Sequence, residues 1–223
     1  MQRGGGGLVP GTSLGRGYHT VLAMRVAIID YEAGNLTSVQ RALAHLGVQA
    51  EVTADPARVV AADRVIFPGV GAAASCMASL RGKGLDGALK AAVAAGRPTL
   101  GICLGLQLLF EHSEEDGGVP CLGLLPGRVV RFQRDDPAIK IPHMGWNPTT
   151  LTDPVLGRGL DQPVLYYVHS YHVVPGPGVE VIATCDHGGE FCSGVRRDNL
   201  VAVQFHPEKS GATGLKLLAN FLA

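Results

Sequence analysis

The chain has 223 residues, with 19 Lys and Arg against 19 Asp and Glu, so its formal net charge is zero. This balance argues against broad electrostatic binding to nucleic acid or to an anionic membrane. A hydrophobic content of 46% and a charged content of 17% exclude a disordered acidic or basic tail. No apolar run is long enough to cross a membrane, and the length fits one domain with at most an appendage.

Residues 1–23 differ from the rest of the chain. They are rich in glycine, contain no acidic residue and lack the sustained apolar core of a signal peptide. A strand pattern begins only at Met24, so we expect Met24 to be the natural start. Residues 1–23 are then a disordered leader or an artificial extension, with a flexible natural extension as the alternative. We expect residues 24–223 to form one domain.

Short apolar runs alternate with helical patterns through the first half. The spacing predicts strands at 26–29, 48–53, 65–67 and 99–102, and helices at 35–46, 85–95 and 104–111. This alternation predicts an α/β fold, a doubly wound and mostly parallel sheet with helices on both faces.

The second half reads differently. Strand-like runs at 129–132, 164–168, 179–184, 191–195 and 200–204 are separated by Pro and Gly, with little helix between them. We expect them to add antiparallel strands or hairpins to the sheet. A last helix at 212–222 carries an apolar stripe.

The strongest local feature is Gly101-Ile102-Cys103-Leu104-Gly105, between a predicted strand and a predicted helix. This is the arrangement of a nucleophile elbow, with Cys in place of Ser. Glycine on either side of the strained turn avoids a collision of side chains. The following helix would point its N-terminus at the sulfur and favour the thiolate. The alternative is a buried structural cysteine beside helix-packing glycines.

His206 and Glu208 follow the apolar run at 200–203. A cysteine nucleophile needs a base that takes its proton and later returns one to the leaving amine, and histidine suits this role near neutral pH. A carboxylate at Glu208 could hold the imidazole in the required tautomer. Alone, His-x-Glu is more often a surface pair; together with the cysteine elbow it indicates a triad.

Pro68-Gly69-Val70-Gly71 ends the third predicted strand. Backbone N–H groups there, together with that of Leu104, could bind an oxyanion. An ordinary strand-ending turn is the alternative. All three features lie at carboxyl ends of strands, where open α/β sheets bind their ligands.

In combination these motifs resemble the triad (class I) glutamine amidotransferases, over the span from Met24 to the C-terminus. Further segments resemble the glutaminase subunits that serve histidine biosynthesis. These segments are Asp30-Tyr31-Glu32-Ala33-Gly34-Asn35, His143-Met144-Gly145-Trp146-Asn147, Val168-His169-Ser170-Tyr171 and Gln204-Phe205-His206-Pro207-Glu208-Lys209-Ser210. The resemblance implies a flavodoxin-like class I amidotransferase fold.

The resemblance also implies roles for residues. Cys103 would attack the side-chain amide of L-glutamine and form a thioester, while His206 transfers protons and Glu208 orients it. Gly69, Val70, Gly71 and Leu104 would form the oxyanion site. Substrate contacts would come from Gln107, Glu115, Ser170 and Tyr171.

A partner protein is expected as well. One glutaminase domain uses up residues 24–223, so the released ammonia needs a second protein to receive it. The resemblance implies a heterodimer with a cyclase subunit of (β/α)8-barrel fold, which makes imidazole glycerol phosphate and aminoimidazole carboxamide ribotide. Asn35, Trp146 and Lys209 would lie at or near the interface, although Trp146 could equally pack in the core.

No cofactor or metal is expected, because His169 and His172 point to opposite faces of a strand-like run and no carboxylate or Cys completes a site. His143 and His187 are expected to be surface or hydrogen-bonded histidines. The acidic run 114–116 is expected to be exposed to solvent, and only the resemblance assigns a role to Glu115. The cysteine count is odd and no C-x-x-C occurs, which predicts free thiols in a reducing cytoplasm.

Three other functions stay open at this point. The first is a glutaminase partner in pyridoxal phosphate, anthranilate or purine synthesis, with the same chemistry at Cys103. The second is a free-standing Cys hydrolase or peptidase of similar fold. The third is a regulatory or binding module without catalysis, which has no need of Cys103, His206 and Glu208 together.

Overall fold

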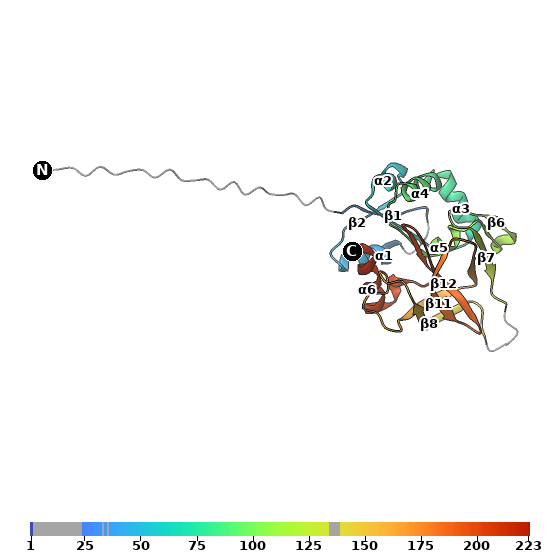
Figure 1. The fold of residues 1–223 in the computed structure, drawn as a ribbon. Coiled ribbons are helices and arrows are strands. Elements are labelled where there is room, and N and C mark those ends of the chain that lie inside the picture. The colour runs from blue at the N-terminus through green and yellow to red at the C-terminus, as the bar shows by residue number, and fades with distance from the viewer. Residues whose placement is uncertain (2–23, 33, 35, 134–138) are drawn as a thin grey trace.

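The computed structural model describes residues 1, 24–32, 34, 36–133 and 139–223. The predicted leader, except Met1, lies outside these described residues. The rest forms one large mixed sheet with helices on both of its faces (Figure 1). The predicted α/β fold with a mostly parallel first half is therefore confirmed.

The parallel part of the sheet has the strand order β2-β1-β3-β4-β13. These strands are β1 (Val26–Ile29), β2 (Ala50–Thr53), β3 (Arg64–Gly69), β4 (Thr99–Cys103) and β13 (Leu200–Val203). β1, β4 and β13 are buried at every position, the pattern of strands that are covered on both faces.

The expectation for residues 200–204 was wrong in one respect. β13 pairs antiparallel with β12 but parallel with β4, so it belongs to the parallel part of the sheet. Its four residues are apolar and buried on both faces, which suits a central parallel strand. The carboxyl ends of β4 and β13 consequently lie side by side, and the chain after β13 reaches Cys103.

The remaining strands pair mostly antiparallel, as predicted for the second half, and the exception is the short parallel pairing of residues 112–113 with residues 128–129. They are β5 (His112–Ser113), β6 (Val119–Pro120), β7 (Gly127–Arg131), β8 (His143–Leu151), β9 (Val164–His169), β10 (Tyr171–Pro175), β11 (Glu180–Asp186) and β12 (Glu190–Arg197). β8 was not predicted, because Gly145 and Pro148 interrupt its apolar alternation. It pairs with β9 along most of its length and joins β11 at its end.

Helices lie between the parallel strands along the chain, and a last helix follows the final strand. They are α1 (Leu36–His45), α2 (Pro56–Ala61), α3 (Ala73–Gly82), α4 (Leu85–Ala94), α5 (Leu104–Leu108) and α6 (Gly211–Leu222), with short 3-10 turns η1 (Glu115–Gly117) and η2 (Pro207–Lys209). α2 was missed although Asp55-Pro56 is a helix-start signal: the Asp55 carboxylate accepts the Ala57 N–H at 2.9 Å. α5 is shorter than predicted, because the Glu111 N–H donates to the Gly127 carbonyl at the start of β7.

Two apolar clusters cover the two faces of the sheet. Alternate residues of β1 divide between them, with Ala27 and Ile29 facing α2 to α5 and Val26 and Ile28 facing α1 and α6. In Figure 1, α2, α3 and α4 lie above the sheet, and α1 and α6 lie below it on the side of the C-terminus.

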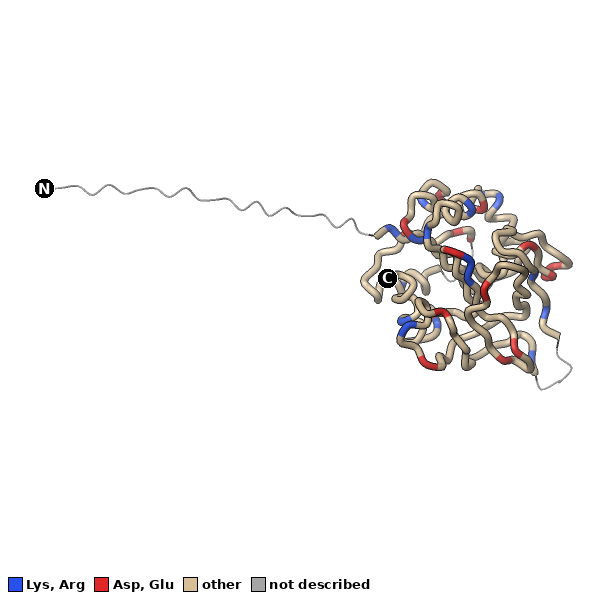
Figure 2. The backbone as a smooth tube through the Cα atoms, viewed as in Figure 1, with Lys and Arg blue, Asp and Glu red and all other residues tan. Residues whose placement is uncertain are grey.

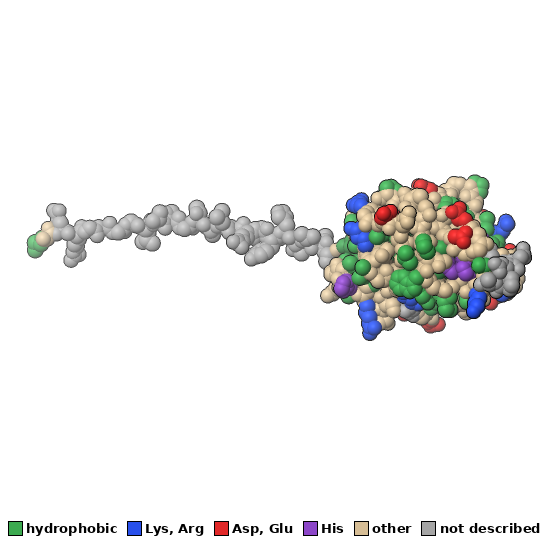
Figure 3. All heavy atoms as spheres, turned by 90° about the horizontal axis from the view of Figure 1, so that it is seen from below, with side chains coloured by type: hydrophobic (Ala, Val, Ile, Leu, Met, Phe, Trp, Pro, Cys, Tyr) green, Lys and Arg blue, Asp and Glu red, His purple; other side chains and the backbone are tan. Residues whose placement is uncertain are grey.

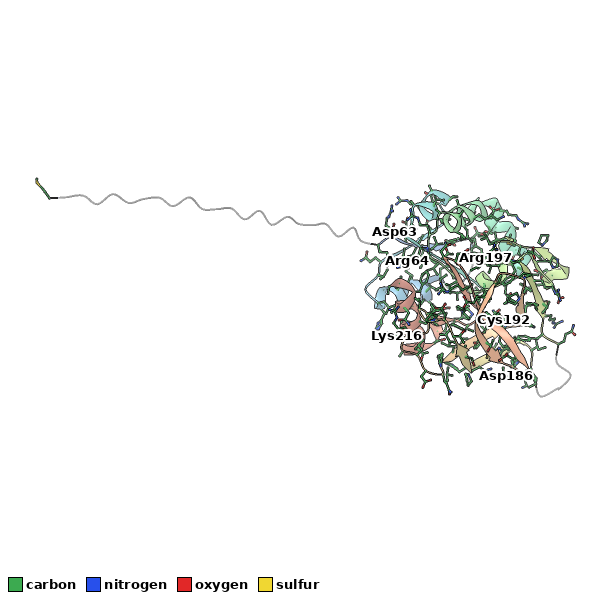
Figure 4. The ribbon with its side chains drawn as sticks, in the orientation of Figure 1. Asp63, Arg64, Asp186, Cys192, Arg197 and Lys216 are labelled. Carbon is green, nitrogen blue, oxygen red and sulfur yellow. The ribbon has the colours of Figure 1, made fainter. Side chains whose placement is uncertain are left out.

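Charged residues are distributed over the described chain with both signs interspersed (Figure 2). Arg64 at the start of β3 and Arg197 at the end of the antiparallel β12 mark the amino edge of the parallel strands (Figure 4). Cys103 lies at the opposite, carboxyl edge. Within the described residues, every helix is too short or too polar to span a membrane.

Candidate active site

Cys103 ends β4, and α5 begins with the next residue. Its φ of 55° is a positive value that a non-glycine residue rarely adopts, so the backbone at the cysteine is strained. A Cβ on Gly105 would lie 1.9 Å from the carbonyl oxygen of Phe67, and one on Gly101 would lie 2.9 Å from Ala202 Cβ. The two glycines thus let the turn pack against the adjoining strands β3 and β13.

His206 and Glu208 follow β13 and form a buried pair beside Cys103. His206 Nδ1 lies 2.8 Å from Glu208 Oε1, and the side chains are 2% and 1% exposed. Burial lowers the pKa of His206, but a negatively charged Cys103 sulfur and the Glu208 carboxylate outweigh it and raise that pKa to about 9. His206 Nε2 is buried and has no hydrogen-bond partner among the described residues. The arrangement can hold an imidazolium beside a thiolate.

The backbone of His206 is fixed by β9. The His206 N–H donates to the Tyr166 carbonyl at 2.9 Å. The Ser210 hydroxyl accepts the Tyr166 N–H at 3.0 Å and donates to the His206 carbonyl at 2.7 Å. These bonds tie the loop that carries the histidine to the strand beside it.

A cavity of about 330 Å³ opens at Cys103, a size suited to a small ligand. Its walls contain Cys103, His206 and most of the predicted oxyanion and substrate residues, namely Val70, Gly71, Leu104, Gln107, Glu115, Ser170 and Tyr171. A larger hollow of about 480 Å³ is lined by residues of β8, β11 and the loop before β9, and contains no member of the Cys103 group.

Gly69 and Gly71 occupy positions that other residues would not fit. A Cβ on Gly69 would lie 2.3 Å from the Tyr31 hydroxyl, and Gly71 has a φ of 103°. The Tyr31 hydroxyl donates to the Pro68 carbonyl at 2.8 Å and so supports this segment from the loop after β1. This supporting contact of Tyr31 was not predicted from the sequence. Leu104 is the first residue of α5. The first N–H groups of a helix have no acceptor within that helix, so α5 itself does not bind the Leu104 N–H.

Hydrogen bonds join Gln107, in the wall of the cavity, to the sulfur of Cys103. Gln107 Nε2 donates to the Tyr171 carbonyl at 3.0 Å and to Gln204 Oε1 at 3.1 Å. Gln204 Nε2 in turn donates to Cys103 Sγ at 3.7 Å. Gln204 was not singled out from the sequence, although its position two residues before His206 at the end of a buried strand was a signal.

Glu115 is not the solvated residue that its acidic run indicated. Its Oε2 accepts the Ala73 N–H at the start of α3 at 2.8 Å, and the side chain lines the cavity. Burial raises the pKa of Glu115, and the charge of Asp116 adds to that rise. Glu115 therefore connects the cavity to the helix that follows Gly71.

Of the predicted interface residues, Trp146 is 53% exposed on β8, so the alternative of core packing is wrong for it. Its ring lies edge-on to Tyr166, at 5.8 Å between centroids, and the Lys209 ammonium lies 5.9 Å from the Tyr166 ring centre. Asn35 lies outside the described residues. In Figure 3, the molecule is viewed from the side on which β8 lies in Figure 1, and apolar side chains gather near the middle of this face.

The histidines of β8 and β9 pack together in the interior. His143 Nδ1 lies 3.0 Å from His169 Nε2, and both rings are buried, so of the two expected positions, on the surface or in a hydrogen bond, His143 has the second. Burial lowers the pKa of His169 to about 3, which keeps the ring neutral. In the described part of the chain, no three His, Cys, Asp or Glu side chains are arranged to hold a metal ion.

Comparisons with known proteins agree with this geometry. Residues 27–223 match the family model "Glutamine amidotransferase class-I". The chain is 52% identical to the imidazole glycerol phosphate synthase subunit HisH of Nitrosococcus oceani, over 88% of this chain and 96% of the relative. It is 46% identical to the HisH subunit of Acinetobacter baylyi, over 89% of this chain and 97% of that one.

A solved structure described as a glutamine amidotransferase superposes with a TM-score of 0.71 at 22% identity, over 88% of this chain and 96% of its own. That likeness bears on the fold alone. Together with the sequence matches, it places the turn at Cys103 in a known architecture. The chain belongs to the class-I glutamine amidotransferase family and, within it, to the HisH subunits of imidazole glycerol phosphate synthase.

Proposed function

We propose that this chain hydrolyses L-glutamine to glutamate and ammonia at Cys103, as the glutaminase subunit of imidazole glycerol phosphate synthase in histidine biosynthesis. The observation that carries the proposal is the buried His206–Glu208 pair beside Cys103, in a cavity that also contains the oxyanion and substrate residues. A nucleophile, a base and an orienting carboxylate are the parts that acyl transfer from an amide requires.

In the first half of the reaction, the Cys103 thiolate attacks the side-chain carbonyl carbon of glutamine. The negative charge on the tetrahedral oxygen is taken up by the Leu104 N–H and by the backbone of 69–71. His206 then gives its Nε2 proton to the departing nitrogen as the C–N bond breaks, so ammonia leaves and a glutamyl thioester remains.

In the second half, neutral His206 takes a proton from water, and the hydroxide attacks the thioester carbonyl. The C–S bond breaks, glutamate leaves and Cys103 returns as the thiolate beside a protonated His206. Glu208 holds the ring through Nδ1 in both halves, so that Nε2 stays aimed at the reacting atoms.

Substrate glutamine would be held by the walls of the same cavity. Glu115 is the candidate partner of the substrate ammonium, and Gln107, Ser170 and Tyr171 are candidates for its remaining polar contacts. The Tyr171 carbonyl accepts a hydrogen bond from the Gln107 amide, so Tyr171 would hold that amide in place as well as shape the cavity wall.

Ammonia formed here would pass to a cyclase subunit, which we propose to be a (β/α)8 barrel that makes imidazole glycerol phosphate and aminoimidazole carboxamide ribotide. The exposed Trp146 ring, with the partly buried Tyr166 ring against it and Lys209 beside Tyr166, suits the centre of such an interface. Tyr166 also bonds the His206 loop, so a partner on this surface would touch the strand that holds the base. The five cysteines are free, which suits a reducing cytoplasm.

The test is glutamine turnover by the purified chain, alone and with the cyclase subunit and its nucleotide substrate. We expect low turnover alone and a large increase in the complex, with no turnover by Cys103→Ala in either state. Equal turnover in both states would contradict the coupled-subunit part of the proposal. Turnover by Cys103→Ala would contradict the assignment of the nucleophile.

A further inference from the structure

Gln204 stands between the nucleophile and the substrate wall, and the reaction as described gives it no task. Its side chain is fully buried, and its backbone N–H donates to the Ser193 carbonyl of β12 at 2.8 Å. We infer that Gln204 is a positioning residue for the nucleophile, which aims an amide N–H at Cys103 Sγ and so stabilises and orients the thiolate. This inference deepens the proposed function and rests on it.

The direction of the Gln204 amide is determined by its neighbours. The Tyr171 carbonyl can only accept a hydrogen bond, so the Gln107 group that faces it at 3.0 Å must be the NH₂. The same NH₂ faces Gln204 at 3.1 Å, which requires an oxygen there. The NH₂ of Gln204 is then the group left to meet the sulfur, at 3.7 Å.

A donor at this position has a chemical consequence. An N–H group stabilises a thiolate and does little for a thiol, because hydrogen bonds to charged acceptors are the stronger ones. Gln204 is buried, so water does not replace the donor when it is removed. The Gln204 amide also orients the sulfur relative to the wall that would hold the substrate, because Gln107 belongs to that wall and donates to the same Gln204 side chain.

Two substitutions of Gln204 separate the effect of its N–H donor from the effect of its side-chain shape. Gln204→Glu keeps the size and the oxygen that Gln107 needs, but it places a carboxylate oxygen against the sulfur. Gln204→Met removes donor and acceptor and adds no charge. Both leave in place the native titratable groups that face the cavity and the sulfur, and Gln204→Glu adds one carboxyl group to them. These native groups are Tyr31, Glu115, His169, Tyr171, His206 and Glu208.

The first measurement is the rate at which iodoacetamide alkylates Cys103 in the full chain as a function of pH, followed by mass spectrometry of the peptide that contains it. We expect both variants to shift the profile to higher pH, with the larger shift for Gln204→Glu. The second measurement is glutamine turnover in the complex with the cyclase. We expect kcat to fall about 10- to 100-fold, with a smaller change in KM for Gln204→Glu, because Gln107 keeps its acceptor.

Asn220→Leu is the matched control. Asn220 is a buried amide in α6 that donates to the Leu156 and Arg158 carbonyls, outside the cavity. Its loss removes two hydrogen bonds from a buried side-chain amide, one of them buried and the other partly buried, so thermal stability should fall while the alkylation profile keeps its wild-type position.

An unchanged alkylation profile in both Gln204 variants would overturn the inference, even if they melt at lower temperature, because a purely structural role lowers stability without moving the profile. If Gln204→Met does not fold, the size-conserving Gln204→Glu still decides. Failure of the proposed function looks different: the wild-type complex would lack glutaminase activity, whereas the alkylation comparison needs no turnover at all.

Discussion

Substitution of Gly105 by alanine tests whether the elbow depends on close contact between α5 and β3. The added Cβ would lie 1.9 Å from the Phe67 carbonyl oxygen and 3.0 Å from its carbonyl carbon. Both contacts are with backbone, so no side chain can rotate away, and α5 must move from β3 by roughly 1 Å. Overpacking of this kind costs about 3 kcal/mol, which corresponds to a fall in Tm of about 6–12 °C for a domain of this size.

The same shift would displace the Leu104 N–H, which begins α5, and Cys103, which directly precedes it. A misplacement of roughly 1 Å at a catalytic group can cost about 100-fold in rate, so we expect kcat in the complex to fall at least that far. Thermal melts followed by circular dichroism and glutamine turnover in the complex measure the two effects.

Gly87→Ala is the opposite control. Gly87 lies within α4, has a helical backbone and no heavy atom within 4 Å of an added Cβ. Alanine there should stabilise the helix by about 0.5–1 kcal/mol and leave turnover unchanged. If Gly105→Ala melts with wild-type Tm and retains wild-type kcat, the steric reading of the elbow is refuted.

Further predictions follow from the loop after β13 and from the exposed face of β8. Glu208→Gln removes a carboxylate that raises the pKa of His206. In the wild type we expect turnover to be lost at high pH, near pH 9, and in the variant this loss should begin at lower pH. The kcat of the variant should also fall roughly 10- to 100-fold. The pKa of His206 is higher in the folded than in the unfolded protein, so its contribution to the free energy of unfolding is complete below about pH 6.5 and is lost as pH rises through about 9. Urea unfolding across that range should show a decline in the free energy of unfolding, and this decline should be smaller in Glu208→Gln. Ser210→Ala removes a partly buried hydrogen bond to β9 and a buried one to the His206 loop and should cost about 2 kcal/mol in a urea titration; an unchanged midpoint would contradict that role. Trp146→Ala should weaken binding of the cyclase by about 30-fold in calorimetry with little change in Tm, whereas Val60→Ala, an exposed residue of α2, should alter neither; equal effects would argue against an interface on β8.

The features that sequence predicted well are those with local physical requirements. β1 was placed with its correct bounds, because four apolar residues lie between a basic residue and an acidic one. The elbow was recognisable because a strained turn between a strand and a helix demands glycine at 101 and 105, and the structure supplies the contacts that enforce this. The roles of Cys103, His206 and Glu208 in the reaction remain predictions, although their side chains do lie together.

What sequence missed depends on contacts between distant segments. The parallel pairing of β13 with β4 joins residues about a hundred positions apart, and no local pattern distinguishes it from an antiparallel pairing. Gln204 and Tyr31 look like ordinary polar residues until the fold places one at the sulfur and the other beneath Gly69. Glu115 was predicted to be solvated because it lies in an acidic run, and its hydrogen bond from the Ala73 N–H joins residues that are far apart in the sequence.

The most direct test of the account is to trap the covalent intermediate. Rapid acid quenching of the complex during glutamine turnover, followed by digestion and mass spectrometry, should show a glutamyl thioester on the peptide that contains Cys103 and on no other cysteine. The adduct should accumulate in the wild type and be absent from Cys103→Ser. Turnover with no adduct at Cys103, or with an adduct at Cys76, Cys121, Cys185 or Cys192, would contradict the central claim.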